Sequence, residues 1–122
     1  MTKEKLLTAV MAAAKAIDDK FGMDIKILDI SGISVLADYF LIATANNPNQ
    51  TRAMCHEAEG ALRDHGIPVI HSEGINDATW ALMDFGAIVV HIFNKDQRDH
   101  YNLERLWGDA VPVEVTIPAP TR

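Results

Sequence analysis

The sequence predicts a single α/β domain in which helices flank a mixed sheet of about five strands. The chain has 122 residues, of which 48% are hydrophobic, and a chain of this size forms one domain that buries a core without disulfides or a structural metal. Apolar residues recur at helical spacing near the N-terminus, and several later segments are short, apolar and of strand length. No internal repeat, low-complexity block or linker divides the chain.

The first third of the chain predicts one helix followed by two strands. Apolar side chains three and four residues apart favour a helix over residues 3–21, with Gly22 as its C-terminal stop. Residues 24–29 alternate well enough for a short strand, and residues 31–36 form a connection. Residues 38–45 are apolar on both faces, which indicates an interior strand that is covered on both sides.

Residues 47–65 predict a second helix. Asn47 caps its start, Pro48 suits the first helical position because no donor is needed there, and Gln50 reaches back as in a capping box. Gly66 then ends the helix with a left-handed residue.

The following segments predict three more strands. Residues 69–71 complete a strand, helix, strand unit over residues 38–71, whose two strands we expect to be parallel with a right-handed crossover. Residues 78–84 and 87–93 form the fourth and fifth strands, which we expect to pair as a hairpin through a tight turn that contains Gly86.

The C-terminal part predicts a helical region and a tail. Residues 94–107 are helical, with Arg98 among the solvated side chains. The α/β domain therefore covers residues 1–110. Residues 111–122 begin with alternating apolar residues but contain three prolines, so they form an edge strand at best and otherwise an extended or disordered arm.

Composition indicates which class of partner the protein binds and which cellular compartment suits it. Seventeen acidic and 11 basic side chains give a net charge of −6, which argues against general duplex binding and favours a basic protein as partner. Cys55 is the only cysteine, so an intrachain disulfide is excluded and a reducing cytosol fits. The longest apolar run has about seven residues, against roughly 20 for a membrane-spanning helix. We therefore expect a cytoplasmic protein that does not contact membranes.

Three aspartates offer an enzymatic alternative. Asp29, Asp38 and Asp84 lie at strand ends, where a metal-dependent nucleotidyltransferase holds two metal ions between carboxylates. The other parts of such a site are missing, since the chain has no glycine-serine motif with a paired acid, no phosphate-cradling loop and no P-loop lysine. The five histidines lack the spacing of a zinc site, and Cys55 and His56 point about 100° apart on a helix. The residues therefore predict no metal, no cofactor and no nucleophile.

Two residues on the fourth and fifth strands have both a functional and a structural interpretation. Trp80 shares a strand face with Leu82 and Asp84, so it is either a binding anchor beside an acid or a core tryptophan. His91 interrupts the apolar fifth strand, so it is either a buried histidine with a hydrogen-bond partner or part of a functional surface.

Motifs in the second half of the chain resemble the Iojap family, also called ribosomal silencing factor. The most specific block is Val-His-x-Phe at residues 90–93, followed by Arg-x-x-Tyr-x-Leu-Glu-x-Leu-Trp at residues 98–107. The resemblance covers about residues 3–109. Its other matching positions are Asp38-Tyr39-Phe40, Gln50, Glu73-Gly74, Trp80, Asp84 and Gly86.

The resemblance implies a nucleotidyltransferase-like fold without enzymatic activity. It further implies that the protein binds the large ribosomal subunit through its fourteenth ribosomal protein, on the face that meets the small subunit. Binding there obstructs subunit joining and represses translation under nutrient limitation or in stationary phase. The resemblance also implies that the free protein is a homodimer.

The resemblance places Trp80 in the contact with the ribosomal protein. We therefore expect a partner-binding surface on the fourth strand, with acidic side chains that face lysine and arginine of the partner. The predicted surface comprises Glu73, Asp77, Trp80, Ala81, Leu82, Met83, Asp84 and His91. A third interpretation is an interaction module that dimerises through the edge of its sheet and binds something other than ribosomes.

Overall fold

The computed structural model describes residues 2–106 and 108–116. It contains a six-stranded mixed sheet in the order β3-β4-β5-β2-β1-β6. The elements are α1 (Lys3–Asp19), β1 (Met23–Asp29), β2 (Tyr39–Ala45), α2 (Pro48–Asp64), β3 (His71–Glu73), β4 (Trp80–Asp84), β5 (Ile88–Asn94), α3 (Lys95–Tyr101), α4 (Leu103–Leu106) and β6 (Val111–Val113). The predicted α/β domain with a mixed sheet is confirmed, with six strands in place of about five.

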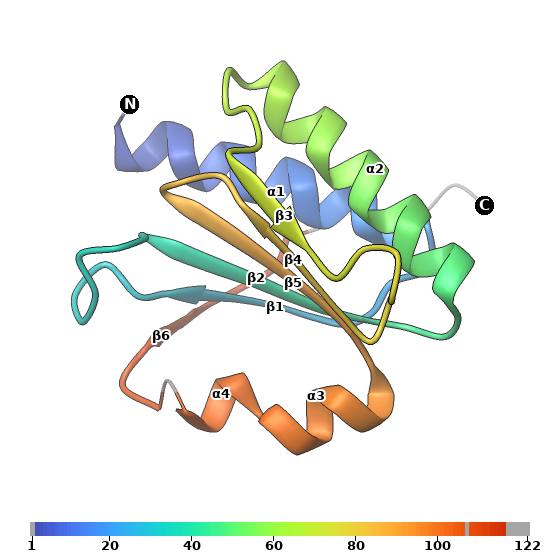
Figure 1. Cartoon of the computed structure of the whole chain (residues 1–122). Coiled ribbons are helices and arrows are strands. Elements are labelled where there is room, and N and C mark those ends of the chain that lie inside the picture. The colour runs from blue at the N-terminus through green and yellow to red at the C-terminus, as the bar shows by residue number, and fades with distance from the viewer. Residues whose placement is uncertain (1, 107, 117–122) are drawn as a thin grey trace.

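Helices lie on both faces of the sheet but cover them unequally. Helices α1 and α2 lie over one face, where the larger hydrophobic core is buried, and the shorter α3 and α4 cross the other face (Figure 1). Strand β2 is covered on both sides, since all but one of its seven residues are buried, as predicted for an interior strand. Among the helices in the described part of the chain, none has the length and apolar character needed to cross a membrane.

The start of α2 is held by the side chains that the sequence predicts. The side chain of Asn47 accepts a hydrogen bond from the backbone N–H of Gln50 at 2.8 Å, and Pro48 lies in the first turn. The Gln50 carboxamide accepts a hydrogen bond from the backbone N–H of Asn46 and donates to two carbonyl oxygens in the turn after α1. Asn47 therefore caps α2, and the Gln50 side chain ties the residue before that cap to the end of α1.

The end of α1 has its left-handed residue one position before Gly22, the predicted stop. Phe21, and not Gly22, has a positive φ, of 65°. The backbone N–H groups of Phe21 and Gly22 donate to the carbonyl oxygens of Asp18 and Ile17, which closes the helix. Gly22 serves a different purpose there, because a Cβ at this position would overlap the side chain of Ile17.

The third strand lies elsewhere than predicted. Strand β3 begins at His71, not at residue 69, and forms one edge of the sheet next to β4. It points in the same direction as β2, as expected for a strand, helix, strand unit, but β4 and β5 lie between them. The parallel neighbour of β2 is β5. The physical reason is burial: most of β5 is buried, whereas all three residues of β3 are exposed and suit an edge.

The C-terminal helical region is divided into two helices. Asn102 has a left-handed φ of 46° and separates α3 from α4. Strand β6 then pairs antiparallel with β1 as an edge strand, which is one of the two conformations predicted for this segment. Residue 107, the last of the predicted helix, and residues 117–122, the end of the predicted tail, lie outside the described residues.

Arg98 on α3 is buried, so the prediction that it is solvated is wrong. The residue is 6% exposed, and its side chain donates a hydrogen bond to Thr44 Oγ1 on β2 at 2.8 Å. The carboxylate of Asp24 lies 3.7 Å from the same guanidinium. Hydrogen bonding and a nearby opposite charge make the burial of a cation tolerable. Arg98 therefore fastens α3 to the sheet.

Candidate functional site

The face of the sheet that lies away from α1 and α2 is the candidate site. Along β4, the side chains of Trp80, Leu82 and Asp84 are half-buried, whereas those of Ala81 and Met83 are each 1% exposed. Ala81 and Met83 belong to the core under α1 and α2. They were predicted in or beside the partner surface, and in this structure they support β4 from behind rather than lie on the exposed face.

Pairing between β4 and β5 completes this face. Trp80 lies opposite Phe93, and Leu82 lies opposite His91. Residues directly opposite each other in an antiparallel pair share a face of the sheet. The sharing of one face by Trp80, Leu82 and Asp84, predicted from alternation, is therefore present in the sheet.

An open groove of about 350 Å³ lies on this face, beside the part that α3 covers. Its floor consists of side chains from β2, β4 and β5, and one wall is the connection between β1 and β2. We call it the sheet groove. Its lining residues are Ile30, Ser34, Leu36, Ala37, Phe40, Leu82, Asp84, Val89 and His91.

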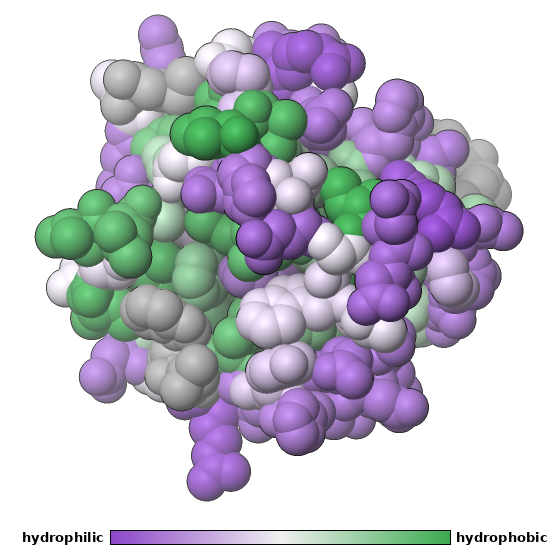
Figure 2. All heavy atoms as spheres, in the orientation of Figure 1, coloured by the Kyte–Doolittle hydropathy of each residue, from purple (hydrophilic) through white to green (hydrophobic). Residues whose placement is uncertain are grey.

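The wall of the sheet groove carries apolar side chains that point into solvent. Val35 and Leu36 are almost wholly exposed, and Ile33 is 44% exposed. Figure 2 shows apolar atoms protruding at the end of the molecule where the β1–β2 connection lies. Exposed apolar side chains grouped beside a groove are typical of an interaction site.

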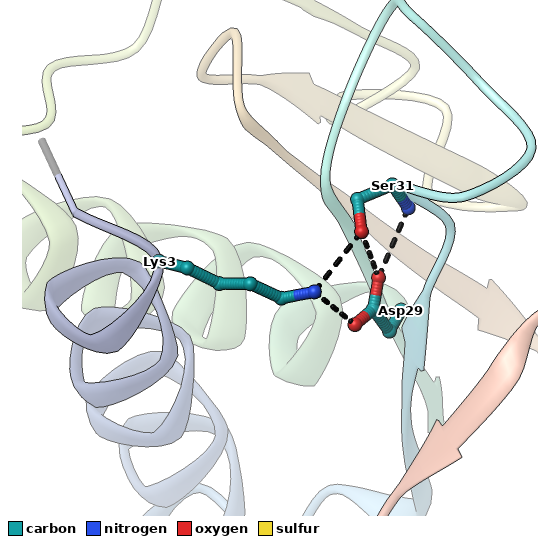
Figure 3. A network of polar contacts seen from close by, with 3 residues as sticks. All are labelled: Lys3, Asp29 and Ser31. Atoms are coloured by element: carbon teal, nitrogen blue, oxygen red, sulfur yellow. Dashed lines mark hydrogen bonds and ion pairs between the residues drawn. The ribbon is translucent and has the colours of Figure 1, made fainter.

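A polar network fixes the base of this wall (Figure 3). The Lys3 ammonium, at the start of α1, lies 2.7 Å from one carboxylate oxygen of Asp29 and donates a hydrogen bond to Ser31 Oγ at 3.1 Å. The other carboxylate oxygen of Asp29 accepts hydrogen bonds from the Ser31 backbone N–H and hydroxyl. The network therefore holds the first residues of the connection against β1 and α1.

The carboxyl group of Asp29 should make the free energy of unfolding depend on pH in the acidic range. Partial burial on its own raises the pKa of Asp29, but hydrogen bonds from Lys3 and Ser31 outweigh it and lower the pKa below the ordinary 3.8. A carboxyl group with a lowered folded-state pKa stabilises the fold above its unfolded pKa and loses that contribution as the pH falls through the folded value. Asp29→Asn should therefore cost about 1 kcal/mol of unfolding free energy at pH 7.

Urea unfolding of both proteins from pH 7 to pH 3 measures this effect. The difference between wild type and Asp29→Asn should be constant above about pH 5 and shrink once the pH falls below the ordinary carboxyl value. Asp64→Asn, at the exposed end of α2, is the control and should change stability by less than about 0.5 kcal/mol. A difference for Asp29→Asn that grows toward low pH would contradict the role given to the network.

Trp80 is half-buried in an aromatic cluster between the sheet groove and α3. Its ring stacks on Phe93 with centroids 5.1 Å apart and lies 4.4 Å from the ring of Tyr101 on α3. Its indole N–H donates a hydrogen bond to His91 Nδ1 at 3.1 Å. Trp80 thus has features of both a core tryptophan and a binding anchor, since part of its ring packs on Phe93 and Tyr101 and part remains accessible.

Acidic side chains lie on and beside the sheet groove. Asp84 lines it and also accepts a hydrogen bond from the backbone N–H of Gly86, which closes the hairpin turn. Glu73 and Asp77 are exposed, on the strand next to β4 and in the loop that precedes β4. Glu73 Oε1 lies 2.9 Å from His71 Nε2. The neighbourhood of β4 is therefore negative.

The geometry does not favour the enzymatic alternative. Asp29 lies on β1 and Asp84 on β4, with β2 and β5 between them, so three strand spacings of about 4.8 Å separate their backbones by about 14 Å. Two catalytic metal ions lie about 4 Å apart. Within residues 2–106 and 108–116, no three His, Cys, Asp or Glu side chains are grouped for a metal ion. Burial, with a smaller effect of Glu59, raises the pKa of the Cys55 thiol to about 12, so the reactive thiolate form is disfavoured at neutral pH.

Sequence reasoning missed the residues from β2 and from the β1–β2 connection. Phe40 and Val89 are neighbours on the groove floor, and Leu36 forms part of the wall. One signal was present in the sequence, since Ile33, Val35 and Leu36 are large apolar residues in a connection where polar residues are usual.

Comparisons with known proteins agree on one family. The family model described as "Ribosomal silencing factor during starvation" matches residues 3–122. A protein of Bacillus subtilis named ribosomal silencing factor RsfS is 50% identical over 98 residues, which are 80% of this chain and 83% of that protein. A protein of the same name from Halalkalibacterium halodurans is 43% identical over 115 residues, 94% of this chain and 96% of that protein.

A crystal structure shows the same fold. The structure of a protein from Chromobacterium violaceum matches with a TM-score of 0.80 and 28% identity, and the match covers 98% of this chain and 95% of that one. Family model, sequence relatives and fold all agree with the motifs at residues 90–93 and 98–107. The chain belongs to the ribosomal silencing factor family.

Proposed function

We propose that this protein silences ribosomes by binding the large subunit through its fourteenth ribosomal protein and blocking the joining of the small subunit. The observation that carries the proposal is the sheet groove, an apolar site with exposed apolar side chains on its wall and acids at its side. Such a site suits a protein partner with a basic surface. Repression of translation under nutrient limitation or in stationary phase is the expected consequence.

The mechanism needs no bond to be made or broken. A domain of this size is roughly 30 Å across, about the length of a 20-residue helix. An object of that width on the joining face of the large subunit excludes the small subunit by its volume. The protein is therefore not an enzyme in this proposal, and it needs neither a metal nor a cofactor.

The net charge of the chain supports the choice of a protein contact over a nucleic-acid contact. At −6 the molecule is repelled by phosphate, so binding to ribosomal RNA is disfavoured. In this proposal the carboxylates of Glu73, Asp77 and Asp84 face lysine and arginine of the ribosomal protein, which would speed encounter and set orientation.

The direct test uses separated ribosomal subunits. The purified protein should co-sediment with large subunits and not with small ones. Added before the small subunit, it should also reduce the formation of complete ribosomes. Co-sedimentation with neither subunit, or undiminished joining when the large subunit is saturated, would overturn the proposal.

Leu36→Asn tests whether the wall of the sheet groove takes part. Leu36 is 86% exposed, so its replacement should leave folding unchanged, while loss of apolar contact should weaken large-subunit binding by about 10-fold. Phe21→Asn is the matched control, since Phe21 is 65% exposed and asparagine accepts its left-handed backbone. It lies across the length of β1, about 20 Å away. Equal affinities for the two variants would exclude the wall from the interface.

We also propose that the free protein is a homodimer in the cytoplasm, where ribosomes are found. The exposed apolar side chains of Ile33, Val35 and Leu36 support self-association. Sedimentation velocity at increasing concentration should show a dimer for the wild type, and a monomer at all concentrations would exclude it.

A further inference from the structure

His91 has a buried nitrogen atom that forms no hydrogen bond with the part of the chain that the structure describes. It lies on β5 at the floor of the sheet groove and is 4% exposed. Its Nδ1 accepts the hydrogen bond from the indole N–H of Trp80, at 3.1 Å. Its Nε2 is buried and has no hydrogen-bond partner among the described residues.

The Trp80 hydrogen bond determines which nitrogen of His91 carries the proton. An indole N–H can only donate, so Nδ1 of His91 must be unprotonated to accept it. Burial lowers the pKa of His91 to about 4, so the ring is neutral at pH 7. A neutral ring carries one proton, and that proton is therefore on Nε2.

The Nε2–H group is thus a buried donor that no described residue pairs with. The aromatic ring nearest to it within residues 2–106 and 108–116 is Phe40, whose centroid lies 4.7 Å from that of His91 in an edge-to-face arrangement. A contact of this kind is at most a weak substitute for a hydrogen bond. Leaving a buried donor unpaired costs stability, and native proteins seldom keep such a group without a function.

We propose that His91 Nε2–H donates a hydrogen bond to an oxygen atom of the protein segment that docks in the sheet groove. This inference rests on the proposed function and specifies the partner segment. The segment presents an apolar side chain to the groove, a carbonyl or hydroxyl oxygen to His91, and basic residues to the acids beside β4. Phe40 and Leu82 are both half-buried and line the groove beside His91, so contact with the buried Nε2 requires these side chains to shift.

The buried donor of His91 makes binding depend on the sequence of the partner segment as well as on its charge. A groove lined only by apolar side chains accepts any apolar group of suitable size, whereas a buried donor discriminates against a segment that brings no acceptor. Because Trp80 fixes the orientation of the His91 ring, the donor is held in place before binding. His91 is therefore a specificity-determining residue, and Trp80 positions it.

Nitrogen NMR of the histidine side chains tests the hydrogen bond directly. The wild-type protein is labelled with ¹⁵N histidine at pH 7 and titrated with the purified fourteenth ribosomal protein of the large subunit. The His91 Nε2–H proton should move downfield and exchange with water at least about 10-fold more slowly when bound. His56 and His65, exposed on and after α2 in the opposite layer, are internal controls and should not change.

Two variants separate the donor from the histidine ring. His91→Asn retains an oxygen near the Nδ1 position for Trp80 but has no group at the Nε2 position, so it should bind about 10-fold more weakly. His91→Gln reaches the Nε2 position with an amide N–H and should bind within about 3-fold of wild type. The indole N–H resonance of Trp80 and thermal unfolding show whether both variants keep the indole environment and the fold.

The outcomes of the titration and of the two variants distinguish failure of the proposed function from failure of the His91 hydrogen bond. If the ribosomal protein does not bind at all, the proposed function fails, and this inference fails with it. If it binds with an unchanged Nε2 signal, or if His91→Asn binds as tightly as wild type, the inference alone is wrong. A shifted, protected Nε2–H with selective weakening by His91→Asn supports it.

Discussion

Replacing Trp80 with alanine should weaken binding to the large ribosomal subunit by more than about 25-fold, equivalent to about 2 kcal/mol. Trp80 is the largest side chain on its face of β4, and it fixes His91 beside the sheet groove. The main core lies on the opposite face of the sheet, so the domain should remain folded. Sedimentation binding isotherms and circular dichroism melting curves measure the two expectations.

Trp80→Phe separates packing from hydrogen bonding in the same position. Phenylalanine keeps an aromatic ring against Phe93 and Tyr101 but has no N–H for His91. Its affinity should lie between those of wild type and Trp80→Ala. An alanine variant that unfolds, or one that binds large subunits as wild type does, would exclude Trp80 as an anchor of the interface.

The largest loss of stability is expected for Gly74→Ala, at about 3 kcal/mol or more. Gly74 precedes β4 and has a φ of 76°, and a Cβ there would overlap the backbone carbonyl oxygen of Trp80. An alanine at this position is thus strained by its own backbone and also displaces the start of β4. Denaturant unfolding should show the loss directly.

Gly66→Ala is the matched comparison for this effect. Gly66 has a nearly identical φ of 79°, but a Cβ there meets nothing within 4 Å. An alanine at this position has only the strain of its own backbone, so Gly66→Ala should lower the free energy of unfolding by about 1 kcal/mol. If the two alanine variants are equally stable, close approach to Trp80 is not what requires glycine at position 74.

Local signals predicted the elements well. The cap at Asn47 and the left-handed stop at Gly66 delimit α2 as expected, because both depend on residues next to each other in the chain. The alternation that sets Trp80 apart from Ala81 also holds, since side chains on a strand point to alternate faces.

Non-local arrangements were harder to predict, for a physical reason. The insertion of β5 between β2 and β4 depends on which strand best fills a fully covered position, and no local signal in residues 69–71 reveals it. Arg98 is buried because Thr44, 54 residues away, and Asp24 lie beside it. The wall of the sheet groove was likewise missed, because it forms only when residues 30–37 fold beside β4 and β5.

The two outermost strands restrict how this protein can assemble. Strands β3 and β6 have only three residues each. Pro112 has no N–H to donate at the centre of β6, and Glu73 places a charge on β3. Short strands with proline or charge are poor templates for continuing a sheet into another molecule, and they limit aggregation. Association with any partner should therefore use the faces and loops of the domain, and the protein should stay dispersed when it is abundant.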